Sequence, residues 1–342
     1  MISIHSLPIG NGDCFIITFQ SDQPEKQTQL LVIDSGFAGT YSTLKRELFR
    51  KIQKYDCEMR MLLTHIDQDH IGGYKALFQN SCFQEYSRIK TFYYNTTQSI
   101  LKLCPGLDPD VIEDDDHISL GVETGYRDAI TLETLLESKD VSVLTGLESG
   151  RKLSFGPGIQ AICLSPSRSS LEKYRNWVKG QDGLTTACVP DYGKPLEELM
   201  DKPFIPDQSP TNASSISVLL EGYGHRLLFL GDSQPDDIVD SLRANGYSED
   251  KPLEVDVTKL SHHGSKYNTS PELLHLLRCK YFLISGKGTL GHPDKETLAR
   301  IIQAQPAPVF CFNFDITGKI FSPSEMEKFH IQAEYRTELV LL

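Results

Sequence analysis

Apolar and polar positions alternate over the first part of the chain in a way that predicts short strands separated by one helix. Residues 1–20 hold two apolar runs on either side of Gly10-Asn11-Gly12-Asp13, a pattern typical of a β-hairpin. Residues 30–34 and 59–64 are further apolar runs of strand length. Between them, residues 42–54 carry apolar side chains at helical spacing. The expected order is therefore β-β-β-α-β, with a second helix after it.

A second set of strands and helices is predicted in the C-terminal half. Residues 215–221 and 226–230 alternate like paired strands around the turn Gly222-Tyr223-Gly224. The other expected elements are strands at 88–94, 254–260 and 280–285, helices at 235–245, 271–278 and 294–304, and a final pair of strands. Each half thus places polar residues on loops that directly follow strands.

Residues 96–140 and 165–211 lack this regular alternation. The first stretch is acidic and rich in turn residues, with a short amphipathic helix predicted at 129–139. The second stretch contains six prolines. We interpret both as insertions in a single domain that spans residues 1–342, a length compatible with one large domain.

The composition is that of a globular chain. No apolar run approaches the roughly 18 residues of a membrane helix, and residues 1–5 lack the basic and apolar segments of a signal peptide. The eight cysteines form no C-x-x-C pair and mostly stand singly in apolar stretches, which favours buried reduced thiols. These features predict a cytoplasmic protein with no membrane partner.

The segment Thr64–Gly73 carries the strongest chemical signal. Four potential metal ligands fall within six residues: His65, Asp67, Asp69 and His70. They lie between a predicted strand and a helix expected to begin near Gly72. Imidazole and carboxylate groups together suit zinc, manganese or iron. The alternative interpretation is a polar loop in which Asp69 merely caps the next helix.

Two later segments also follow predicted strands. Asp232 comes directly after Gly231 and could bridge two cations, which bridging carboxylates hold about 3.5–4 Å apart. The alternative is a helix cap before Pro235. The adjacent His262 and His263 must point in different directions, so one can bind a metal while the other contacts substrate. Because open α/β layers gather their sites at the carboxyl ends of strands, we expect all three segments to meet.

In the order and spacing of these segments, the chain resembles the metallo-β-lactamase superfamily, and within it the C-terminal domain of ComEC-type DNA-uptake proteins. The superfamily loop reads His-x-His-x-Asp-His, and that branch has His-x-Asp-x-Asp-His, as at residues 65–70. Further matching segments are Gly10-Asn11-Gly12-Asp13, Asp34-Ser35-Gly36, Asn212 through Ser217, Gly231-Asp232, His262-His263-Gly264-Ser265 and Gly291-His292-Pro293. The resemblance implies an α/β (α+β) chain folded as an αββα four-layer sandwich, with metals at one edge.

The resemblance also implies a two-metal site. One ion would take His65, Asp67 and Asp232, and the other would take Asp69, His70, Asp232 and one histidine of the pair, for which we take His263. Many relatives place another histidine before the bridging aspartate, but none lies between His117 and His225 here. Asn212, Ser214 or a water would approach the first ion instead. Asp13 and Asp34 are expected to orient the ligands.

Two divalent ions, zinc foremost and manganese as the alternative, would activate a water and neutralise a phosphate. Asp69 is expected to accept the water's proton, and His292 or His262 to protonate the leaving oxygen. Lys266 adds a cation beside the site. We therefore predict a phosphodiesterase or nuclease that acts on a nucleotide or nucleic acid.

The net charge of −12 favours a small or single-stranded substrate over duplex DNA. The same site would also serve a hydrolase of a small ester or lactone. A regulatory module that keeps the fold without turnover is the alternative from a different class.

Overall fold

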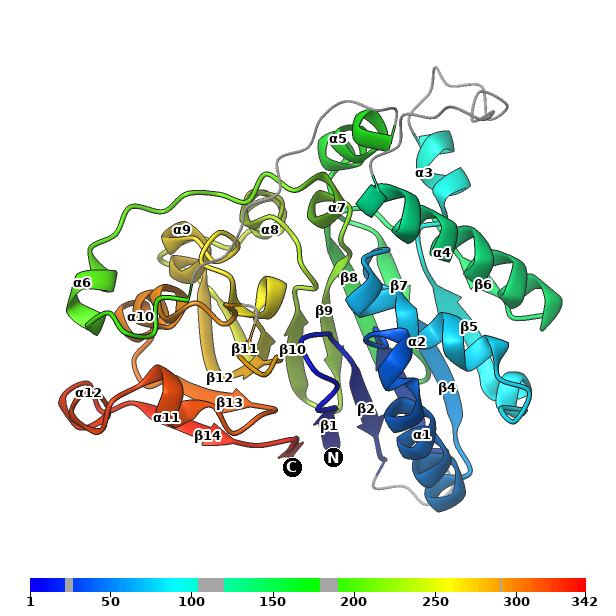
Figure 1. Cartoon of the computed structure of the whole chain (residues 1–342), viewed down its shortest axis with the longest axis horizontal. Coiled ribbons are helices and arrows are strands. Elements are labelled where there is room, and N and C mark those ends of the chain that lie inside the picture. The colour runs from blue at the N-terminus through cyan, green and yellow to red at the C-terminus, as the bar shows by residue number, and fades with distance from the viewer. Residues whose placement is uncertain (22–26, 104–119, 179–189, 290) are drawn as a thin grey trace.

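The computed structural model describes residues 1–21, 27–103, 120–178, 190–289 and 291–342. Over these residues the chain forms two β-sheets that pack face to face, with helices on the outer face of each sheet (Figure 1). The four layers follow from three separate apolar cores. The αββα sandwich predicted from the sequence is therefore confirmed.

The first sheet has the strand order β15-β1-β2-β3-β4-β5-β6. Its strands are β1 (Ile2–Ser6), β2 (Phe15–Phe19), β3 (Gln29–Ile33), β4 (Glu58–Leu62), β5 (Ile89–Tyr93), β6 (Val143–Leu144) and β15 (Glu338–Leu341). β1 and β2 pair antiparallel in the predicted hairpin, whereas β3, β4 and β5 run parallel. The parallel pairs bring the carboxyl ends of β3 and β4 to one edge of the sheet.

The second sheet has the order β14-β13-β12-β11-β10-β9-β8-β7. Its strands are β7 (Lys152–Ser154), β8 (Ile159–Ser165), β9 (Ser217–Gly222), β10 (His225–Phe229), β11 (Leu253–Lys259), β12 (Leu277–Ile284), β13 (Val309–Phe312) and β14 (Gln332–Tyr335). β9 and β10 form the second predicted hairpin, and β10 to β13 run parallel. The hairpin of β7 and β8 was not predicted.

The alternation along a strand decides which layer receives each side chain. On β3, Leu31 and Ile33 contribute to the core between the two sheets, and Leu30 and Val32 contribute to the core under the helices. Both faces are buried, which explains why this strand is apolar at successive positions. The strand therefore sits at the centre of the sandwich.

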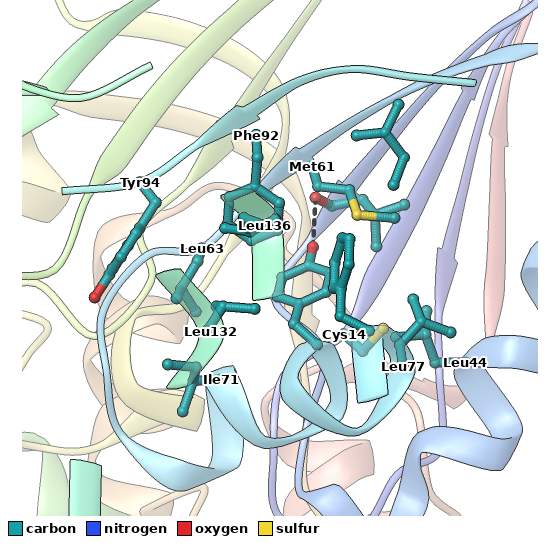
Figure 2. Close-up of a cluster of buried hydrophobic side chains, with 14 of the residues drawn as sticks. Cys14, Leu44, Met61, Leu63, Ile71, Leu77, Phe92, Tyr94, Leu132 and Leu136 are labelled. Carbon is teal, nitrogen blue, oxygen red and sulfur yellow. Dashed lines mark hydrogen bonds between the residues drawn. The ribbon is translucent and has the colours of Figure 1, made fainter. Parts of the chain in front are cut away.

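Helices α1 (Tyr41–Tyr55), α2 (Gln68–Gln79) and α4 (Leu120–Ser138) cover the first sheet, and α8 (Pro235–Ala244), α9 (Pro271–His275) and α10 (Lys295–Ala304) cover the second (Figure 1). Figure 2 shows the core under the first set, where Leu132 and Leu136 of α4 lie beside Phe92 and Leu63. This packing fixes α2, whose first turn carries two of the predicted ligands.

The prediction that this helix begins near Gly72 is wrong, because α2 begins at Gln68. Asp69 and His70 therefore lie in its first turn, where the helix dipole favours a carboxylate. Residue 73, inside this helix, must be a glycine because a Cβ there would come 2.0 Å from the backbone oxygen of Ser35. The small residue lets α2 approach the loop after β3.

Three other boundaries also differ from the predictions. The helix expected at 129–139 begins at Leu120, and Gly125 lets it cross closely over Ile66, whose oxygen would lie 3.1 Å from a Cβ. The helix expected at 271–278 ends at His275 because β12 begins at Leu277. The prediction of a final pair of strands is wrong, because three strands (β13, β14 and β15) follow α10. β15 leaves the second sheet and pairs with β1, where its apolar side chains enter the core between the sheets.

Shorter elements complete the described chain: η1 (Ala38–Thr40), η2 (Glu85–Arg88), α3 (Thr97–Leu103), α5 (Arg168–Val178), α6 (Leu196–Met200), α7 (Pro210–Ala213), η4 (Ser261–Gly264), α11 (Thr317–Ile320) and α12 (Pro323–Lys328). Parts of both predicted insertions, including His117, lie outside the described residues. The division into one domain with two insertions stays a prediction.

The cysteines follow the prediction where they are described. Five free thiols are buried, and Cys82 is free and exposed. In the part of the chain that the structure covers, no helix combines the length and the apolar character needed to cross a membrane.

Candidate metal centre

The loops after five strands meet at one edge of the sandwich. Asp34 follows β3, His65 follows β4, Asp232 follows β10, the His262-His263 pair follows β11, and Ser285 follows β12. A backbone hydrogen bond from Ile216 to Thr64, 3.0 Å long, joins the two sheets at this edge. The parallel strand pairs thus gather the residues that the sequence singled out.

His65, His70 and Asp232 form the centre of the site. One ligand atom from each lies within 4.8 Å of the other two. Oδ2 of Asp232 is 3.4 Å from Nε2 of His70 and 3.9 Å from Nε2 of His65. All three side chains are buried, and no described residue gives a hydrogen bond to either Nε2 or to Oδ1 of Asp232. Buried polar atoms without partners are rare, so these atoms point to a ligand.

Asp69, His70 and His263 form a second group of the same size that shares His70. Nε2 of His263 lies 3.2 Å from Oδ2 of Asp69. The structure therefore brings together five of the six predicted metal ligands. Asp67 stays outside both groups. Its carboxylate lies 3.6 Å from Nε2 of His65, and accepts a hydrogen bond from the Thr211 hydroxyl at 3.3 Å.

Carboxylates orient two of the imidazole rings from behind. Nδ1 of His70 lies 2.8 Å from Oδ2 of Asp34, which also accepts a hydrogen bond from the Thr64 hydroxyl. Nδ1 of His263 lies 3.0 Å from the hydroxyl of Ser285, which donates to Asp13, and 3.2 Å from Oδ1 of Asp13 itself. These acceptors hold the proton on Nδ1 of each ring, which leaves the Nε2 lone pair facing the site. Asp13 and Asp34 thus lie where their predicted orienting role requires.

The surplus of carboxylates shifts the pKa values of both rings upward. Burial alone lowers the pKa of His70, but Asp232, Asp34 and Asp69 raise it well above its usual value. Burial likewise opposes the charge on His263, yet Asp13 and Asp69 raise its pKa to about 9. Without a metal ion, both rings therefore bind a proton more strongly than a free imidazole does, because the surrounding carboxylates carry negative charge that divalent cations would neutralise.

Lys259 is a functional-site residue that sequence reasoning missed. Its buried ammonium forms an ion pair with Asp13, donates a 2.9 Å hydrogen bond to the oxygen of Gly231 and lies 3.7 Å from Oδ1 of Asp232. Burial lowers the pKa of Lys259, but Asp13 and Asp232 raise it above its usual value. The available signal was a lysine at the end of a largely apolar strand, two residues after Val257.

The residues proposed to replace the missing histidine have other contacts. The Asn212 amide donates a 2.7 Å hydrogen bond to Asp207, and the Ser214 hydroxyl donates one of 2.7 Å to the oxygen of Thr211. Thr211 is instead the residue of this loop that touches Asp67. Asp207, which is buried beside the site, was not identified from the sequence.

Two of the predicted acid–base residues, His262 and His292, lie side by side and are partly exposed. The ring of His262 is 4.9 Å from that of His292, measured between centroids, and its Nε2 is 3.8 Å from Oδ2 of Asp232. Nδ1 of His292 lies 3.2 Å from Asp294, and burial lowers its pKa. Lys266 is within 3.1 Å of the same Asp294 carboxylate. The cation expected beside the site is therefore already paired.

Left-handed backbone marks two of the loops. Asp34, His262 and His263 have φ angles of 57°, 48° and 54°, which residues with a Cβ rarely adopt. Such conformations persist only where the surrounding structure imposes them, and they cluster at functional sites. At 262–263 the two successive left-handed residues direct neighbouring rings to different parts of the site.

The donor set fits divalent metal ions. Five carboxylates meet here (Asp13, Asp34, Asp67, Asp69 and Asp232), and Lys259 supplies one opposing ammonium. Imidazole nitrogen and carboxylate oxygen are ligands that zinc and manganese share. The unpartnered nitrogens of His65 and His70 give this fit independent support.

No family model matches the chain, and no curated protein matches it. Among solved structures, the Zn²⁺-bound PqqB of Methylobacterium extorquens is 13% identical, with a TM-score of 0.45 over 100% of both chains. The metallo-β-lactamase fold protein YhfI of Bacillus subtilis is 10% identical, with a TM-score of 0.41 over 99% of this chain and 100% of that one. A metallo-β-lactamase of Cronobacter sakazakii is 12% identical, with a TM-score of 0.34 over 73% and 74%. Because these scores are low, the fold assignment rests on the chain's own layers and strand order, which make it an αββα sandwich with a histidine–aspartate site at the sheet edge.

Proposed function

We propose that this chain is a metal-dependent hydrolase of the metallo-β-lactamase superfamily that cleaves phosphodiesters. The observation that carries the proposal is the pair of buried, unpartnered Nε2 atoms of His65 and His70 facing Asp232. A site with no metal would leave these groups buried without compensation, at about 1–3 kcal/mol each.

Two ions would be held by the residues at the sheet edge. His65, Asp67 and Asp232 would hold the first, and Asp69, His70, His263 and Asp232 the second. When bound, such a pair activates a water for attack and neutralises the charge that develops on the phosphate. Asp34 and Asp13 keep the ligand rings of His70 and His263 in the tautomer that binds.

Side chains would orient the attacking water and protonate the leaving oxygen. Burial raises the pKa of Asp69, but His70 and His263 lower it below its usual value, so this carboxylate stays ionised and orients the attacking water. His262 and His292 lie side by side and are partly exposed, so either ring can give a proton to the leaving oxygen.

The carboxylate content favours a phosphodiester over a lactam. Asp67 stands where lactam-cleaving zinc sites have an imidazole, and the added negative charge suits harder ions that bind phosphate oxygens. The sequence pattern shared with ComEC-type domains supports the same substrate class. The acidic chain, at −12, favours a nucleotide or single-stranded nucleic acid within this class.

The test is a substrate panel with metal-loaded protein: bis-nitrophenyl phosphate, single- and double-stranded DNA, RNA, nitrocefin and an acyl-homoserine lactone. We expect turnover of the phosphodiesters and none of nitrocefin. Turnover of the lactam or lactone alone would reject the proposed substrate class. A metal-loaded protein that turns over nothing in the panel would favour the regulatory alternative.

A further inference from the structure

A groove of about 490 Å³ lies where α6, α10, α11 and α12 meet (Figure 1). Four lysines and two glutamates line it, so its walls carry surplus positive charge in a chain whose net charge is −12. Its charged lining residues are Lys194, Glu197, Lys295, Lys319, Glu325 and Lys328. A groove of this size can hold a small ligand, and its charge favours an anion.

Two of these lysines have no acidic partner. Both glutamates of the groove are neutralised by ion pairs, one with Lys328 and one with Lys295. Lys194 and Lys319 are exposed, and neither ammonium forms an ion pair or a hydrogen bond with a described residue. The surplus charge of the groove therefore belongs to Lys194 and Lys319.

The buried Lys295 holds the walls of the groove together. Its side chain is 2% exposed, and its ammonium donates a 2.8 Å hydrogen bond to the backbone oxygen of Lys194. The same ammonium lies 2.7 Å from Oε1 of Glu325. The segment before α6 is thus tied to α12, so little ordering of the backbone is needed when a ligand binds.

The groove adjoins the loop that carries His292. Tyr192 lines the groove, and a Cβ on Gly288 would lie 3.2 Å from the hydroxyl of Tyr192. Gly288 and His292 belong to the same loop after β12, and Lys295 begins α10 three residues after His292. The groove therefore lies next to the part of the site where the leaving group is expected.

We propose that this groove binds the phosphate next to the scissile one, so that the substrate is a single-stranded chain of nucleotides and not one nucleotide. Lys194 and Lys319 bind the charge of this second phosphate, and the Ser324 hydroxyl, which also lines the groove, donates to its oxygens. Proteins that bind single strands follow the backbone with a positively charged groove in the same way. The inference rests on the proposed function, because the scissile phosphate is the one at the metal centre.

The experiment compares two thymidine substrates with metal-loaded protein: the dinucleotide TpT, with one phosphate, and the trinucleotide TpTpT, with two. We expect the wild type to have a higher kcat/KM for TpTpT. In the double variant Lys194→Ala/Lys319→Ala, the ratio of kcat/KM for TpTpT to that for TpT should fall about tenfold, through KM.

The matched control is Lys280→Ala. Lys280 is also exposed and lines a groove, but that groove lies at the amino ends of β11 and β12, away from the metal centre. Its ratio should equal that of the wild type. A double variant with the same ratio as Lys280→Ala would overturn the inference.

A second readout does not depend on turnover. Fluorescence anisotropy measures the binding of a labelled tetrathymidylate with phosphorothioate linkages to zinc-loaded protein. We expect the double variant to bind about tenfold more weakly than the wild type and Lys280→Ala. Its plot of log Kd against log salt should be shallower by about 0.7, the value for one phosphate of a single strand. Equal affinities would overturn the inference.

Failure of the inference and failure of the proposed function are distinguishable. Hydrolysis of both thymidine substrates with the same ratio in wild type and double variant would reject the groove and keep the proposed function. Binding that depends on Lys194 and Lys319, without hydrolysis of any phosphodiester, would keep the groove as a site for an anionic chain and reject the proposed function. A protein that neither binds nor cleaves these probes would reject both.

Discussion

At the scale of single residues, Asp232 and Asp67 should differ in importance. Oδ2 of Asp232 faces three histidine nitrogens, whereas Asp67 contacts His65 at the edge of the site. We expect Asp232→Ala to abolish phosphodiester hydrolysis, and Asp67→Ala to keep measurable activity at about one-tenth to one-hundredth of wild type. Activity and metal content of both variants, measured on the same preparations, check this. Equal residual activity at equal metal content would contradict the assignment.

The residues that the sequence identified are those with recognisable metal chemistry at a fixed spacing. His65, Asp69, His70, Asp232 and His263 could be found because ligand type and strand ends coincide. Lys259 and Asp207 could not, because their contacts cross more than 25 residues along the chain, as in the hydrogen bonds from Lys259 to the oxygen of Gly231 and from the Asn268 amide to Asp207. A lysine or aspartate outside a recognisable motif is common, and only the folded structure shows which group it touches.

At the scale of elements, the contact between α2 and the loop after β3 holds His70 against Asp34. A Cβ on Gly73 would lie 2.0 Å from the Ser35 oxygen, and backbone cannot move aside as a side chain can. We expect Gly73→Ala to lower the free energy of unfolding by about 1–3 kcal/mol or more. Metal content should fall as well, since α2 carries two ligands.

The matched control is Gly39→Ala. A Cβ at Gly39 meets no atom within 4 Å, so the free energy of unfolding of this variant should be close to that of the wild type. Chemical denaturation of all three proteins measures the difference. If Gly73→Ala were as stable as Gly39→Ala, the close approach of α2 would not be a constraint on the fold.

Elements with strong periodicity were predicted to within a few residues, as for α1, β3 and α10. The start of α2 was not, because all four candidate ligands were assigned to the loop before the helix, whereas the helix begins at Gln68 and includes Asp69 and His70. The last strands were misjudged for a related reason. Local alternation identifies a strand but not its sheet, and β15 joins the first sheet by pairing with β1.

At the scale of the whole molecule, metal removal should make stability depend on pH. The pKa of His263 is raised to about 9 in the metal-free fold, against about 6.5 in an unfolded chain. A raised pKa stabilises the fold fully below about pH 6.5, and this contribution is lost as the pH rises toward 9. We expect the Tm of EDTA-treated protein to fall between pH 7 and 9.

Zinc-loaded protein is the control for this change. A bound ion keeps the imidazole neutral throughout that range, so its Tm should stay nearly constant. Scanning calorimetry of both forms in the same buffers gives the comparison. A metal-free protein whose Tm is flat from pH 7 to 9 would show that His263 does not carry the proton that the surrounding aspartates favour.

The most direct test of the account is the metal content of the purified chain, made without a metal-binding tag and measured by elemental analysis. Five carboxylates and two unpartnered buried imidazole nitrogens at one sheet edge predict between one and two transition-metal ions per chain, zinc or manganese. Hydrolysis of bis-nitrophenyl phosphate should fall with chelation and return with the ion. A chain with no stoichiometric metal, and no activation by any added divalent ion, would contradict the central claim.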